Sequence, residues 1–95
     1  MKFSFEVGHE EKHTVEFEFN QFLGNLSIKV DGNDRIRDFR TLSFKLMKTY
    51  EFEVGNEEKH QVKIEKIRKL ILAGFRKTKY KVYIDGILIK EYEGK

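Results

Sequence analysis

The chain has 95 residues and a net charge of +3, and 37% of its residues are charged with both signs mixed. It contains no cysteine, which excludes disulfides and thiolate metal sites. No apolar run approaches the roughly 18 residues of a membrane span, and the N-terminus shows no signal-peptide pattern. We therefore expect one cytoplasmic domain over residues 1–95 that does not bind a membrane. Its highly charged, proline-free composition resembles that of heat-adapted proteins, so we expect thermostability.

A stretch of eleven residues occurs twice in the chain. Phe5–Val15 and Phe52–Val62 are identical at nine of eleven positions, at a constant offset of 47. Self-similarity at a fixed offset indicates a duplicated structural unit, and two copies are too few for a solenoid. The sequence therefore predicts an internal repeat, 2–48 and 49–95, whose two halves pair into one core.

Each copy of the repeat predicts a β-hairpin. In the first copy apolar residues alternate with polar ones on both sides of a loop at Gly8 to Lys12. The loop length places Phe5 opposite Val15 and Phe3 opposite Phe17, so that register and apolar face agree. The second copy has the same pattern. It predicts that Phe52 lies opposite Val62 and Tyr50 opposite Ile64, with a loop at Gly55 to Lys59.

The segments between the hairpins are also mostly strand-like. Leu26, Ile28 and Val30 alternate before the turn signal Asp31-Gly32-Asn33. We expect a turn at Gln21 to Asn25 and a charged edge strand or loop at Asp34 to Arg40.

Two regions of the second half are harder to read from the sequence. Between Leu42 and Val54 the alternation would point Lys48 into the core, so we place a corner at Met47 to Thr49. Ile64 to Gly74 fits either a helical turn or a bulged strand, because its apolar residues match both spacings.

The last predicted element is a hairpin around Asp85-Gly86. This two-residue turn places Ile84 opposite Ile87 and Val82 opposite Ile89. Together these elements predict an all-β fold, an antiparallel β-sandwich of about eight strands built from two sequence-related halves.

Several short motifs resemble a known family. They are Lys29-Val30-Asp31-Gly32 followed by Ile36-Arg37, Phe44-Lys45-Leu46, Phe52-Glu53-Val54-Gly55, Ile84-Asp85-Gly86 and Lys90-Glu91-Tyr92, with His13 to Glu18 as an early strand. Their order and spacing resemble the Fas apoptotic inhibitory molecule family from about Val7 to Glu93. The resemblance implies an antiparallel β-sandwich without enzymatic activity or cofactor.

The resemblance also carries expectations about function. Animal members have two such domains in tandem and are associated with anti-apoptotic signalling, neurite outgrowth and protection against protein aggregation. This chain differs in having one domain, in carrying Leu42 where the family tends to have Trp, and in an insertion at Arg68 to Gly74. The resemblance therefore implies a non-catalytic protein-interaction module with a stress-protective or anti-aggregation role.

The two Gly-X-Glu-Glu-Lys-His loops raise the question of a metal site. His9 and His13 stand beside Glu10 and Glu11, which offer imidazole and carboxylate ligands. However, Asn56 replaces His9 in the second loop, and strand parity places His13 and His60 on the inner rim. We therefore predict acidic hairpin loops without a metal, in which Gly8 and Gly55 supply a positive φ. Nothing in the sequence indicates catalytic residues or a cofactor.

The segment from Lys63 to Lys81 carries eight basic residues interleaved with Phe75 and Tyr80. Such a strip suits a polyanion such as a nucleic acid, which gives the alternative function. Alternation with inward residues is equally typical of a solvated strand face. The candidate contact residues here are Arg68, Lys69, Arg76, Lys77 and Lys79.

The last hairpin has apolar residues on both faces. Tyr83 and Leu88 are predicted to lie opposite each other on the face away from Val82 and Ile84. Apolar residues on both faces suggest a cover, either the segment Ile67 to Phe75 or a partner chain or second copy. Tyr83 and Leu88 are therefore candidate contact residues for an unidentified protein partner or for a second copy in a homodimer.

Overall fold

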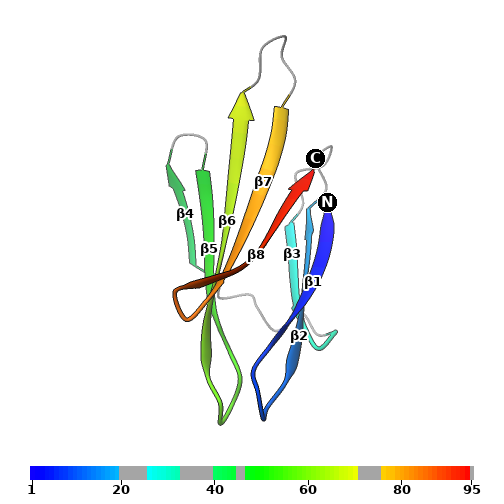
Figure 1. Cartoon of the computed structure of the whole chain (residues 1–95), viewed down its shortest axis with the longest axis vertical. Helices are drawn as coiled ribbons and strands as arrows, with labels where there is room; N and C mark the ends of the chain where they lie inside the picture. The colour runs from blue at the N-terminus through cyan, green and yellow to red at the C-terminus, as the bar shows by residue number, and fades with distance from the viewer. Residues whose placement is uncertain (20–25, 33–39, 45–46, 71–75, 95) are drawn as a thin grey trace. The chain divides into compact units, whose positions relative to one another are not determined.

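The computed structural model describes residues 1–19, 26–32, 40–44, 47–70 and 76–94, and it contains eight β-strands (Figure 1). They form a three-stranded sheet of order β1-β2-β3 and a five-stranded sheet of order β4-β5-β6-β7-β8. The predicted all-β class is confirmed: the described residues form two antiparallel sheets with eight strands in total. The strands are β1 (Lys2–Val7), β2 (His13–Phe19), β3 (Leu26–Val30), β4 (Arg40–Phe44), β5 (Met47–Val54), β6 (His60–Leu70), β7 (Arg76–Ile84) and β8 (Ile87–Gly94).

The chain divides into two compact units. The first comprises Met1–Asp38 with Glu53–His60, and the second comprises Phe39–Phe52 with Gln61–Lys95. The loop between β5 and β6 therefore belongs to the first unit, together with the sheet β1-β2-β3. In the part of the chain that the structure describes, no helix could cross a membrane.

The sheet of the first unit has the predicted register. Phe5 pairs with Val15 and Phe3 with Phe17 across β1 and β2, and Ile28 of β3 pairs with Phe17. All five side chains are buried, and the rings of Phe3 and Phe17 stack with centroids 4.8 Å apart. A shift of one residue would turn each of these side chains to the opposite face, so their burial specifies the register.

The second unit contains a long hairpin of β6 and β7. The two strands pair without interruption from Val62 opposite Ile84 to Leu70 opposite Arg76. Residues 64–70 are therefore strand, and the helical-turn alternative is wrong for them. The ladder extends to Leu70 because Ile64 and Lys66 continue the buried face begun by Val62.

The predicted corner at Met47 to Thr49 is wrong. β4 ends at Phe44 and β5 begins at Met47, and these two residues face each other, so the chain reverses before Met47. Lys48 lies inside β5 and is exposed. The reversal resets the alternation, which removes the reason for a corner at Lys48.

The last hairpin follows its prediction only near the turn. Ile84 pairs with Ile87 and Tyr83 with Leu88, as predicted, but Val82 pairs with Lys90 instead of Ile89. The register shifts between Val82 and Tyr83, so Ile89 is the extra residue of a β-bulge. A β-bulge of this kind cannot be predicted from the alternation of apolar and polar residues.

Some predictions fall outside the described residues. These are the turn at 21–25, all of the charged stretch 34–40 except the backbone of Arg40, and the segment 71–75 with Phe75. The register of β5 with β6 stays a prediction, although the two strands are neighbours in the sheet.

Candidate functional site

The two Gly-X-Glu-Glu-Lys-His loops bind each other within the first unit. The Glu11 carboxylate accepts hydrogen bonds from the backbone N–H groups of Asn56 at 2.7 Å and Glu57 at 2.9 Å. The Glu58 carboxylate accepts hydrogen bonds from the backbone N–H groups of His9 at 2.7 Å and Glu10 at 3.0 Å. We call these two carboxylates and four amides the glutamate clasp. Each loop supplies both the acceptor and the donors, so the clasp is reciprocal.

Glycine at the start of each loop makes the clasp sterically feasible. Gly8 and Gly55 have φ of 105° and 111°, as predicted. A Cβ on Gly8 would lie 2.0 Å from the Glu11 carbonyl oxygen, and one on Gly55 would lie 1.9 Å from that of Glu58. The loop backbone thus folds back over its own glycine, at a distance that no side chain permits.

Backbone amides keep both clasp carboxylates ionised. The pKa of Glu11 is lowered to about 2, first by the amide of Glu57 and then by His13 and the amide of Asn56. The pKa of Glu58 is also lowered to about 2, first by the amide of Glu10 and then by His60. Hydrogen bonds to a carboxylate favour its charged form.

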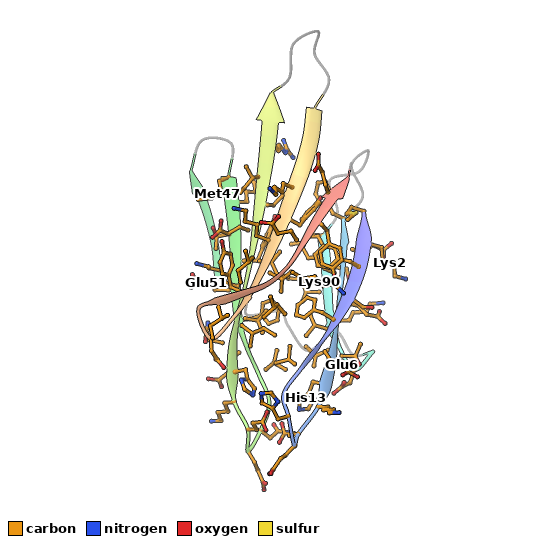
Figure 2. All side chains as sticks on the ribbon, in the orientation of Figure 1. Lys2, Glu6, His13, Met47, Glu51 and Lys90 are labelled. Carbon is orange, nitrogen blue, oxygen red and sulfur yellow. The ribbon has the colours of Figure 1, made fainter. Side chains whose placement is uncertain are left out.

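Two histidines complete the clasp at the inner rim, as strand parity predicted. His60 Nε2 lies 2.6 Å from Glu58 Oε2, and His13 Nε2 lies 2.5 Å from Glu11 Oε2. His13 Nδ1 also lies 2.6 Å from Asp31 Oδ2, and Figure 2 shows His13 beside the loops. The pKa of His13 is raised, mainly by the hydrogen bond to Asp31 and then by that to Glu11.

An acidic hollow of about 450 Å³ lies over the clasp, lined by Glu10, Glu11, Glu57 and Glu58. The described residues contain no group of three or more His, Asp or Glu placed to hold a metal ion. Glu11 and Glu58 already accept hydrogen bonds from the opposite loop and from a histidine. These two carboxylates thus join the two loops.

Three lysines of β6 and β7, Lys63, Lys79 and Lys81, lie near carboxylates. Lys79 Nζ lies 3.4 Å from Glu91 Oε2, and Lys63 Nζ lies 3.6 Å from Glu65 Oε1. Lys63 Nζ also lies 4.5 Å from the centroid of the Tyr83 ring. Arg68 is half-buried, whereas the side chains of Lys69, Arg76 and Lys77 lie outside the described residues. The outer face of this hairpin is thus a mixed-charge surface.

The sequence prediction did not identify a lysine that is buried in the structure. Lys66 follows Val62 and Ile64 on the buried face of β6, lies opposite Tyr80 and is 2% exposed. The pKa of Lys66 is lowered to about 8, mainly by burial and then by the nearby charges of Arg68 and Lys48. Burial also raises the pKa of Tyr80 to about 12. Extending the strand alternation past Ile64 would have revealed this position.

The largest exposed apolar side chains in the described part of the chain are on β8. Ile87 is 68% exposed, and Leu88 and Ile89 are each 44% exposed. β8 is the last strand of the five-stranded sheet in the described residues, and β7 is its hydrogen-bonded neighbour in that sheet (Figure 1). The predicted contact residues Tyr83 and Leu88 do lie opposite each other, with Tyr83 half-buried and Leu88 exposed.

Comparison with known proteins supports the resemblance seen in the motifs. The family model of the Fas apoptotic inhibitory molecule (FAIM1) matches residues 4–95. The comparisons with curated proteins and with solved structures found no match. The family model spans the repeated loops, the long hairpin and β8. The chain therefore belongs to the Fas apoptotic inhibitory molecule family.

Proposed function

We propose that this chain is a non-catalytic protein-interaction domain that binds extended, aliphatic polypeptide segments along β8. The observation that carries the proposal is the run of three exposed aliphatic residues, Ile87 to Ile89, on an edge strand. Natural edge strands are usually protected by charge, by a bulge that twists the edge or by a covering element. Here a bulge is present, yet three consecutive aliphatic side chains remain exposed.

An extended polypeptide matches the chemistry of this edge. The outer row of N–H and C=O groups on β8 can pair with an added strand, and its aliphatic side chains can pack against those of the incoming segment. Unfolded proteins expose such segments, which supports the stress-protective role that family membership suggests. A cytoplasmic location is part of the proposal, since a chain without cysteine needs no oxidising compartment.

The test is suppression of client aggregation. Wild-type protein should delay light scattering by a heat-stressed client, and Ile89→Lys should reduce the delay several-fold by placing a charge on the open edge. Gln61→Lys adds the same charge at another exposed strand position and should leave the delay unchanged. Equal delays for all three proteins would refute the β8 site. If instead the protein forms a dimer at higher concentration, seen as a doubled molecular mass, and Ile89→Lys prevents this dimer, the occupant of the β8 edge is a second copy.

Binding of a polyanion is the alternative function. The ion pairs of Lys63 with Glu65 and of Lys79 with Glu91 weaken this alternative, because these lysines already face carboxylates. A thermal-shift assay with RNA and DNA separates the two proposals, since a ligand that prefers the native state raises Tm. Stabilisation at low salt that vanishes at about 0.2 M would favour the polyanion. We expect no shift.

A further inference from the structure

His13 contacts carboxylate oxygens with both ring nitrogens. Nδ1 lies 2.6 Å from Asp31 Oδ2 and Nε2 lies 2.5 Å from Glu11 Oε2. A neutral imidazole has one N–H group, so its second nitrogen would present a lone pair to a carboxylate. Two short contacts to carboxylates are favourable only when both nitrogens donate. The geometry therefore favours the imidazolium form of His13.

The ring joins two parts of the first unit that are distant in sequence. On one side, Asp31 is held at the end of β3, where its Oδ1 accepts a hydrogen bond from Thr14 N–H at 2.8 Å. On the other side, the Glu11 carboxylate accepts hydrogen bonds from the backbone amides of Asn56 and Glu57 in the second loop. A continuous chain of charge-assisted hydrogen bonds thus runs from the turn after β3 to the loop between β5 and β6.

We propose that His13 is a proton-dependent latch for the Glu11 half of the glutamate clasp. When both nitrogens are protonated, the ring fixes Glu11 in the position that receives the second loop. Loss of one proton turns a donor into a lone pair and weakens the hold on Glu11. This device is independent of the function proposed for β8.

The surroundings of His13 explain where the latch operates. The charged groups that act on the ring are Asp31, after β3, and Glu11, in its own loop, and both raise its pKa. The second loop presents Glu58 and His60, which bind each other, and its backbone amides at Asn56 and Glu57 donate to Glu11. Glu11 stays ionised because its pKa is about 2, so the proton that leaves with rising pH is that of His13.

NMR of the intact chain tests the latch directly. At pH 7 we expect both ring nitrogens of ¹⁵N-labelled His13 to carry protons, and the ring to titrate above the ordinary histidine pKa of about 6.5. Above that titration, amide exchange at Asn56 and Glu57, corrected for its intrinsic pH dependence, should accelerate about tenfold or more, as expected for loss of one charge-assisted bond. Amides inside the β1–β2 ladder report any global opening.

Variants make the result specific to one half of the clasp. His13→Gln should accelerate exchange at Asn56 and Glu57 at pH 6 and remove its pH dependence, while the amides of His9 and Glu10 remain protected by Glu58. His60→Gln is the matched control. It should accelerate exchange at His9 and Glu10 and leave Asn56 and Glu57 protected. A neutral His13 ring at pH 7 would overturn the proposal, even if the variants failed to fold. Exchange at Asn56 and Glu57 that does not respond to His13 titration would also overturn it.

Discussion

Glu11 and Glu58 lie 47 positions apart in the sequence, and each binds the backbone of the loop that carries the other. The relationship is reciprocal because both loops have the same residues at the acceptor position and the same backbone at the donor positions. The nearly exact repetition of Gly-X-Glu-Glu-Lys-His thus has a physical explanation. The glycine, the second glutamate and the histidine of the motif each have an equivalent role in both loops.

Removing the charge of one clasp carboxylate should lower stability. In Glu11→Gln the side-chain oxygen can accept fewer amides and the new NH₂ group opposes the donors, so we expect Tm to fall by roughly 5 °C. Glu10→Gln, in the same loop, is the control and should leave Tm within about 1 °C. Differential scanning calorimetry at pH 6 measures both. Equal Tm values for the two variants would show that the clasp contributes nothing to stability.

The loop glycines should tolerate no side chain. Gly8→Ala combines a positive φ with a Cβ placed 2.0 Å from a backbone oxygen, so we expect a loss of about 3 kcal/mol or more in the free energy of unfolding. Gly86→Ala is the matched control. It also has a positive φ, of 81°, but no atom lies within 4 Å of its Cβ, so it should lose only about 1 kcal/mol. Urea denaturation compares them, and similar losses would contradict the steric account.

Stability should depend on pH through the clasp. The stabilisation by Glu11 and Glu58 is fully present above the ordinary pKa of 4.5 and is lost as pH falls through about 2. The pKa of His13 is raised from 6.5, so its contribution is fully present below 6.5 and is lost as pH rises through the higher folded value. Between pH 4 and pH 8 we therefore expect the urea concentration at half-unfolding to be highest from about pH 4.5 to 6.5. A midpoint that rises steadily from pH 4 to pH 8 would contradict this account.

Lys66 should be a destabilising residue. Its pKa is lowered from 10.5 to about 8, so the unfolded chain binds more protons than the folded one between these values, and stability should rise across this interval. Lys66→Met keeps a long side chain without the charge and should gain on the order of 2 kcal/mol at pH 7. It should also abolish the alkaline rise, which urea denaturation at pH 7 and 10.5 measures. Lys59→Met, at an exposed position, is the control.

Local sequence was sufficient for the first hairpin and the turn at Asp85-Gly86. The alternation around Phe5 and Val15 specifies both the buried face and the loop length, because neighbouring side chains of a strand point to opposite faces. The same alternation gave a wrong position for the chain reversal between β4 and β5. It would have buried Lys48, so the corner was predicted at Met47 to Thr49 instead of before Met47. The alternation also gave the wrong partner for Ile89. A β-bulge shifts the pairing register by one residue, and the alternation of apolar and polar residues does not reveal this shift.

The amino-acid sequence by itself determined the strand periods, the duplicated loops and the family of this chain, because each depends on residues close together or on direct similarity. Only the tertiary structure decided that Glu11 binds the loop of Glu58, that His13 bridges Glu11 and Asp31, and that Lys66 is buried. These relationships join residues that are distant along the chain or depend on which strand face is covered. Periodicity describes one strand at a time, whereas hydrogen bonds and burial depend on which segments meet in space.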